Sequence, residues 1–118
     1  MGKSTCPLEH AEQVTFVNEF EKAWPDVWLF AVPNGGFRHK ATADKLKAEG
    51  LRPGVPDIVI PEWHVYIEMK RQKGGRLSDD QAKWLGYLAE CGYTCIVAKG
   101  WEDAFKQLAD AGYKADGF

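Results

Sequence analysis

The chain has 118 residues and a formal net charge of −2, and 45% of its residues are hydrophobic. This length can bury a core without disulfides or a structural metal, so we expect one domain over residues 1–118. Its apolar runs, such as Val27 to Pro33, are far shorter than the roughly 20 residues that span a bilayer, and MGKSTCPLEH lacks the apolar core of a secretory signal. The sequence therefore excludes a membrane-spanning protein and predicts a cytosolic one.

The small net charge hides an uneven distribution. The segment from Arg38 to Arg76 holds nine Lys and Arg against five Asp and Glu, a local charge of +4, so the rest of the chain carries −6. Phosphate contacts act within about a Debye length, so a local excess of this kind is compatible with a nucleic-acid partner. Ordinary scatter of charge on a solvated surface explains the count equally well.

The three cysteines, Cys6, Cys91 and Cys95, are odd in number and form no CxxC pair. We interpret them as reduced thiols, which excludes a disulfide framework and a cysteine zinc site.

The first half of the chain predicts three elements. Helical periodicity runs from Pro7 to Trp24 and ends before Pro25. Trp28–Val32 has the composition of a buried strand, and the PNGG turn at Pro33–Gly36 ends it. Ala41–Glu49 is a short helix, closed by a glycine.

The second half predicts a hairpin, two helices and a further strand. The hairpin lies in PGVPDIVIPEWHVYIEMK, residues 53–70. A helix over Asp79–Cys91 follows, with Ser78 as its N-cap and Gln81 at the capping-box position. Thr94–Ala98 is a β-branched strand, and Glu102–Ala111 is a last amphipathic helix.

These elements alternate as α, β, α, β, β, α, β, α. The strand, helix and strand from Tyr66 to Ala98 form a crossover unit, whose two strands should be parallel. A hairpin that leads into this unit makes a mixed sheet, so the predicted fold class is α/β, with helices packed against the sheet.

The hairpin concentrates charge on one face. If Ile60 pairs with Val65 across the turn PEWH, Asp57 lies directly opposite Glu68, and Lys70 shares their face. Paired Cβ atoms lie about 5 Å apart, so two such carboxylates repel one another unless a cation lies between them. Oxygen ligands favour Mg²⁺ or Mn²⁺, although an incidental polar face is the simpler alternative.

Two helical positions add to this face. On a helical wheel, Glu9 and Gln13 fall within the apolar stripe of the first helix, where polar residues are unexpected, and Glu12 lies on the flank of the stripe. We therefore rank Glu9 first and Glu12 second as a further acidic ligand. Gln81 shares a face with Trp84 and is a second polar candidate, although a capping role accounts for it equally well.

These residues match a known pattern. Pro56-Asp57 followed by Glu68-Met69-Lys70 resembles the PD-(D/E)xK nuclease signature. Five motifs in order resemble the VRR-NUC domain, the virus-type replication-repair nuclease module, over nearly the whole chain, and copies of this length resemble its phage and bacterial members. The motifs are EHAEQ (9–13), PNGG (33–36), GLRPGVPD (50–57), IEMKRQKGGRLSDDQ (67–81) and GYTCIVAKGWEDA (92–104).

The resemblance implies a restriction-endonuclease-like fold and metal-dependent hydrolysis of DNA phosphodiester bonds. It implies that Asp57 and Glu68 are metal ligands, that Lys70 is the catalytic lysine and that Gln81 is the family's glutamine. Glu9 fits the helix glutamate better than Glu12, because it stands four residues before Gln13. Small members also resemble Holliday-junction resolvases, which implies a homodimer that acts on branched DNA.

Candidates for DNA contacts come from the basic segment and from the PNGG turn before it. They are Asn34, Arg38, His39, Lys40, Arg71, Lys73 and Arg76. The loop RQKGGR directly follows the strand that ends at Lys70, so its basic residues are the strongest of these candidates. Some of these side chains could instead only solvate the loops, and Asn34 could serve only the turn.

Two further functions stay open from the sequence. One is a flap-processing or end-processing nuclease, and the other is a nuclease-like module that binds junctions without cutting them. Loss of Asp57, Glu68 or Lys70 would have favoured the binding module, and all three are present. A metal protein unrelated to nucleic acid has little support, because the three histidines are scattered.

Overall fold

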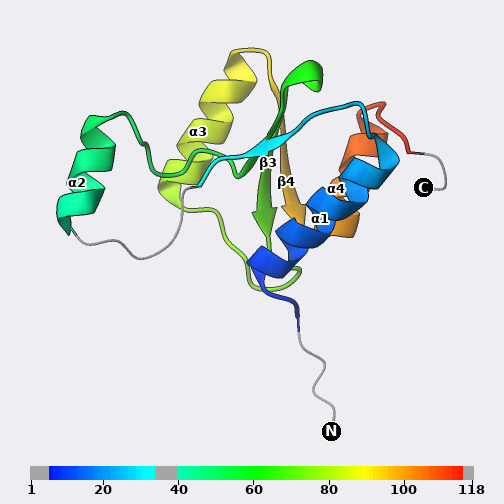
Figure 1. Ribbon diagram of the computed structural model, residues 1–118, viewed down its shortest axis with the longest axis horizontal. Helices are drawn as coiled ribbons and strands as arrows, with labels where there is room; N and C mark the ends of the chain where they lie inside the picture. The colour runs from blue at the N-terminus through cyan, green and yellow to red at the C-terminus, as the bar shows by residue number, and fades with distance from the viewer. Residues whose placement is uncertain (1–5, 34–39, 116–118) are drawn as a thin grey trace, which may run out of the picture.

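The protein is described by a computed structural model, which covers residues 6–33 and 40–115. Its main elements, in chain order, are α1 (Glu9–Ala23), β1 (Phe30–Ala31), α2 (Lys40–Ala48), β2 (Ile58–Ile60), β3 (Val65–Lys70), α3 (Asp79–Glu90), β4 (Thr94–Lys99) and α4 (Trp101–Asp110). Figure 1 shows three layers, with α1 and α4 on one side of the sheet and α3 on the other.

The sheet has the mixed topology that the sequence predicts. Its strand order is β1-β2-β3-β4, with β1 antiparallel to β2 and β2 antiparallel to β3. β3 and β4 are parallel, and α3 is the crossover between them. The predicted α/β fold, a mixed sheet flanked by helices, is confirmed.

The hairpin register is also as predicted, since Ile60 pairs with Val65 and Ile58 with Ile67. A single 3₁₀ turn, Pro61–Trp63, joins the two strands, and His64 closes it in the left-handed conformation. Alternation along the strands then places one set of side chains under α1 and α4, where each is fully buried. This set comprises Ile58, Ile60, Val65, Ile67 and Met69.

The prediction of a buried strand over Trp28–Val32 is wrong. Only Phe30–Ala31 pairs with β2, and both residues are exposed. Trp28 is 83% exposed, and Leu29, with Val27, packs against the core. The error has a topological cause: β1 is the edge strand, so a composition typical of a central strand lies where the sheet ends.

The second half of the fold follows the predicted local signals. Ser78 caps α3 in a full capping box, in which Gln81 N–H donates to Ser78 Oγ (3.1 Å) and Ser78 N–H donates to Gln81 Oε1 (2.9 Å). The three cysteines are free thiols, as predicted. Within the described ranges, no helix combines the length and the apolar character needed to cross a membrane.

Candidate metal centre

Three carboxylates from different parts of the chain meet at the carboxyl end of β3. Glu9 lies in the first turn of α1, Asp57 directly precedes β2, and Glu68 lies within β3. One oxygen of each lies within 4.8 Å of one oxygen of the other two. Figure 1 shows why they converge, because the start of α1 lies beside the end of β3. We call these three residues the carboxylate cluster.

Asp57 is held by the backbone of the neighbouring strand. Met69 N–H donates to Asp57 Oδ2 at 2.8 Å, which fixes the position of the carboxylate beside β3. The loop before Asp57 packs closely on the start of α3. A Cβ at Gly54 would lie 2.5 Å from the carbonyl carbon of Asp80, and Gly54 has φ +88°, so glycine is required there.

Glu68 is almost completely buried, and only one of its oxygens has a partner. Oε2 accepts a hydrogen bond from Gln81 Nε2 (3.0 Å) and lies 3.6 Å from Lys70 Nζ. Among the described residues, the buried Oε1 has no hydrogen-bond partner. A buried carboxylate oxygen without a partner is costly, and either a proton shared with the neighbouring Asp57 carboxyl or a bound cation would relieve that cost.

The cluster is electrostatically strained. Burial, and then the nearby Asp57 charge, raise the pKa of Glu68 to about 8. Burial also raises the pKa of Asp57 and of Glu9. Three carboxyl groups at this spacing do not all ionise without a compensating positive charge, and Lys70 supplies only one. Their hard oxygen donors and the partnerless Oε1 of Glu68 fit a divalent cation.

Lys70 and Gln81 form a hydrogen-bonded pair beside the cluster. Lys70 is buried, and its Nζ donates to Gln81 Oε1 at 2.9 Å. The same oxygen accepts the capping bond from Ser78 N–H, while the amide nitrogen donates to Glu68. The capping role and the site role predicted for Gln81 therefore coincide, because one amide serves both.

Glu12 corrects the helical-wheel interpretation of α1. It was placed on the flank of the apolar stripe, yet it is 2% exposed and continues the buried line of Phe16 and Phe20 at intervals of four residues. Its Oε1 accepts from Trp101 N–H and its Oε2 accepts from Gln72 Nε2, both at 2.8 Å. Glu12 thus joins the start of α4 and the loop after β3 to α1. The four-residue spacing was the signal for its burial, whereas nothing in the sequence marked its two partners.

The described part of the chain includes only some of the residues predicted to contact DNA. Asn34, Arg38 and His39 lie outside the described residues. Lys40 begins α2 and is exposed, with its Nζ 2.8 Å from Asp44. Three further basic side chains are exposed in the loop that directly follows β3: Arg71, Lys73 and Arg76.

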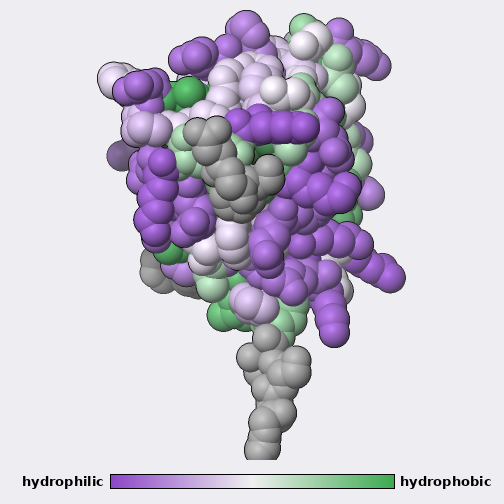
Figure 2. Space-filling model, turned by 90° about the vertical axis from the view of Figure 1, so that its right-hand side faces the viewer, coloured by the Kyte–Doolittle hydropathy of each residue, from purple (hydrophilic) through white to green (hydrophobic). Residues whose placement is uncertain are grey.

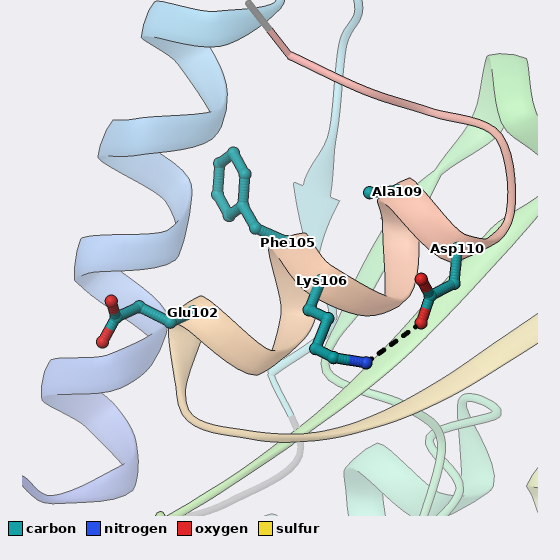
Figure 3. Close-up of a pocket in the computed structure, with 5 residues that line it drawn as sticks. All are labelled: Glu102, Phe105, Lys106, Ala109 and Asp110. Carbon is teal, nitrogen blue, oxygen red and sulfur yellow. Dashed lines mark hydrogen bonds and ion pairs between the residues drawn. The ribbon is translucent and has the colours of Figure 1, made fainter. Parts of the chain in front are cut away.

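The outer side of the molecule, over α1 and α4, presents mainly hydrophilic side chains (Figure 2). A hollow of about 330 Å³ lies there, beside α4, and Figure 3 shows its lining. Glu102 and Phe105 point toward α1, and Lys106 pairs with Asp110 at 3.3 Å. The lining holds two carboxylates, Glu102 and Asp110, and one lysine that is already paired. Its net negative charge makes the hollow a poor binding site for a polyanion.

The fold and the site define an α/β protein with a partly buried carboxylate cluster whose oxygen donors fit a divalent cation. A family model described as "VRR-NUC domain" matches residues 11–102, so the chain belongs to the VRR-NUC family, a family of nucleases. Glu9 lies just before the matched residues.

A solved structure described as "VRR_NUC domain protein" is similar to this chain. Its TM-score is 0.73 at 21% identity, with 89% of this chain and 88% of that chain covered. At this identity the likeness supports the fold alone. No curated protein matches the chain.

Proposed function

We propose that the protein is a divalent-metal-dependent, structure-specific DNA endonuclease, a cytosolic homodimer that acts like a Holliday-junction resolvase. The observation that carries the proposal is the carboxylate cluster, with a partnerless Glu68 oxygen and a buried lysine beside it. Membership of a nuclease family gives this arrangement a substrate, DNA. The homodimer and the preference for branched DNA rest on the resemblance of small family members to resolvases.

Asp57, Glu68 and Glu9 are the residues that would hold the ion. Mg²⁺ or Mn²⁺ would polarise a phosphate oxygen and lower the pKa of a bound water. Asp57 would offer a carboxylate that Met69 N–H holds in place, and Glu68 would offer its partnerless Oε1. Glu9 is partly exposed and completes the set from α1.

Lys70 would position the attacking water and stabilise the negative charge that grows on the phosphate. Its ammonium is already held, because Gln81 Oε1 accepts from it at 2.9 Å and Glu68 lies 3.6 Å away. Such a fixed donor costs little reorganisation when the charge develops. Gln81 therefore acts as a positioning residue, which orients both the lysine and the glutamate.

The basic loop after β3 would hold the DNA backbone. Arg71, Lys73 and Arg76 are exposed and follow Lys70 directly, so their side chains can reach phosphates next to the cut. Lys40 would contribute from α2. Such contacts set the affinity and its salt dependence, whereas the carboxylate cluster sets the rate.

Cleavage of end-labelled four-way junction, flap and linear duplex tests the proposal. Each substrate is incubated with Mg²⁺, Mn²⁺ or EDTA, and wild type is compared with Lys70→Ala. The matched control is Lys114→Ala, which removes an exposed lysine far along the chain from the cluster. We expect paired, symmetric cuts in the junction that disappear in EDTA and in Lys70→Ala but persist in Lys114→Ala.

The other outcomes separate the alternatives. Cuts on the flap alone would keep the nuclease and reject the resolvase. Binding of all substrates without cutting in any ion would favour the non-cleaving junction-binding module. Cutting by Lys70→Ala at the wild-type rate would remove the proposed role of the lysine.

A further inference from the structure

Aromatic side chains form a row on the same face of the sheet as Glu68. The strand register pairs Phe30 with Val59 and Val59 with Tyr66, and paired residues share a face. Tyr93 extends the row, since its ring centroid lies 5.1 Å from that of Tyr66 at an interplanar angle of 88°. We call the three rings of Phe30, Tyr66 and Tyr93, together with Val59 between the first two, the aromatic row.

The rings of this row are open to solvent. Phe30 is 52% exposed, Tyr93 is 37% exposed and Tyr66 is half-buried. Val59, which lies between Phe30 and Tyr66 in the sheet, is buried. The four residues, together with Pro61 and His64, line a shallow hollow of about 260 Å³. Among the described lining residues there is no Lys, Arg, Asp or Glu, so the hollow suits a flat uncharged group rather than a phosphate.

The row directly adjoins the carboxylate cluster. Tyr66 stands two residues before Glu68 on the same strand and the same face, a separation of roughly 6.6 Å. On the other strand of the hairpin, Val59 likewise stands two residues from Asp57 and shares its face. A DNA strand with one phosphate at the cluster therefore has neighbouring nucleotides within reach of the row on one side.

We propose that the aromatic row stacks nucleobases that are unpaired beside the cleaved phosphate, so that among branched DNAs the protein binds most tightly those with unpaired nucleotides at the branch. The inference rests on the proposed function, from which it takes DNA as the substrate. It adds the type of DNA that the protein binds best. Every base has a π face, so aromatic rings bind single strands with little sequence preference. A base inside an intact duplex is stacked and paired, and cannot use the row without being extruded.

The exposed area argues against a second copy of the chain as the main occupant. An aromatic side chain buries 150–250 Å² at most, so the exposed fractions of Phe30 and Tyr93 together offer roughly 130–220 Å². A stable protein interface buries about 800 Å² on each partner. The row alone is too small for such an interface, and its size matches one or two bases.

Binding to two related DNAs tests the proposal. A labelled duplex is compared with the same duplex carrying an unpaired single-stranded arm, in EDTA and at one salt concentration. Phe30→Ala and Tyr93→Ala should each weaken binding of the armed duplex about 5- to 150-fold, which corresponds to 1–3 kcal/mol per stacked base. Both should leave binding of the plain duplex unchanged, and Phe30→Tyr and Tyr93→Phe, which keep the rings, should bind as wild type.

Tyr87→Ala is the matched control, because Tyr87 is an aromatic residue of α3, 61% exposed, outside the row. It should bind both DNAs as wild type does. Equal losses on both DNAs, no loss on either, or a wild-type protein that does not prefer the armed duplex would overturn the proposal. A loss that accompanies a fall in sedimentation mass would assign the row to a second copy instead.

This experiment fails separately from the proposed function. Stacking is measured by binding without metal, whereas the nuclease is measured by cutting with Mg²⁺ or Mn²⁺. A protein that cuts junctions but shows no ring dependence would lose only the aromatic row. A protein that shows ring-dependent binding but never cuts would lose only the nuclease mechanism.

Discussion

Two buried glutamates have opposite surroundings. Glu12 is 2% exposed and both of its oxygens accept hydrogen bonds at 2.8 Å, from Trp101 N–H and from Gln72. Glu68 is 1% exposed, yet one oxygen has no partner among the described residues and Asp57 lies nearby. The first carboxylate is fully hydrogen-bonded, and the second keeps an oxygen available.

We interpret this difference as the difference between a structural acid and a candidate metal ligand. A buried charge stabilises a fold only where its hydrogen bonds are made, and Glu12 meets this condition by joining α1 to α4 and to the loop after β3. Glu68 does not meet it, so the native state carries a cost there that a bound cation would relieve. Burial alone does not mark a candidate site, whereas burial with an oxygen that lacks a hydrogen-bond partner does mark one.

The sharpest test of the comparison is Glu68→Gln. The amide keeps the size of the side chain but removes the charge, so cleavage in Mg²⁺ should fall by at least about 10³-fold. The free energy of unfolding in EDTA at pH 8 should not fall, because repulsion from Asp57 is removed. Cleavage rates and urea melts of the same preparation measure both effects.

Opposite results would reverse the roles. If Glu68→Gln were unstable, Glu68 would be a structural residue, and its partnerless oxygen would have no functional meaning. If it cut at the wild-type rate, the cluster would not be the catalytic centre.

Glu12→Ala should have the second largest effect, on stability. It removes the side-chain acceptor of the Trp101 N–H, at the first residue of α4, and that of the Gln72 amide, which should cost about 2–4 kcal/mol. Urea melts measure this loss. Isothermal titration of Mn²⁺ below the midpoint of unfolding should still show binding, and loss of binding in a folded Glu12→Ala protein would make Glu12 part of the site.

Much of this comparison could be predicted from the sequence. The alternation of IVI and VYIEMK fixed the hairpin register, and the register placed Asp57, Glu68 and Lys70 together, because residue period and strand pairing are local properties. The capping box was equally local. The helical wheel ranked Glu9 as the further acidic ligand, and Glu9 does lie in the cluster. It stands at the first residue of α1, which begins beside the end of β3.

Long-range partners could not be predicted in this way. Glu12 receives its hydrogen bonds from residues 60 and 89 positions away, and no periodicity links them. The edge position of β1 likewise depends on strand order, which the composition of Trp28–Val32 does not contain. Composition predicts that a residue is apolar, and only topology decides whether anything covers it.

Metal and pH should act together on stability through Glu68. Its pKa is raised from 4.5 to about 8 in the fold, so between these values the native state binds a proton that the unfolded chain has lost. Without metal, this contribution is fully present below about pH 4.5 and is lost as the pH rises through about 8. A cation binds the ionised cluster, so the rise in Tm on adding Mn²⁺ should be larger at pH 8.5 than at pH 5.

Thermal melts with Mn²⁺ or EDTA at both pH values measure this effect. Bound Mn²⁺ should raise the free energy of unfolding by about 2.7 kcal/mol when the ion is at 100 times its Kd. Glu68→Gln is the control for the other titrating groups, and the difference in Tm between wild type and this variant should shrink as the pH falls. A metal effect that is equal at both pH values would contradict the coupling.

The smallest effect, and the finest test, is expected from Gln72→Ala. This change removes the donor to Glu12 Oε2 and leaves the bond from Trp101 N–H, so Glu12 comes to resemble Glu68 in having one satisfied oxygen. Gln72 is exposed, so water can replace part of its amide, and the cost should be about 1 kcal/mol in urea melts. Mn²⁺ affinity should stay unchanged, because among the described residues Glu12 belongs to no group of three side chains that could share an ion. A change in Mn²⁺ affinity would instead show that the loop after β3 couples the two glutamates.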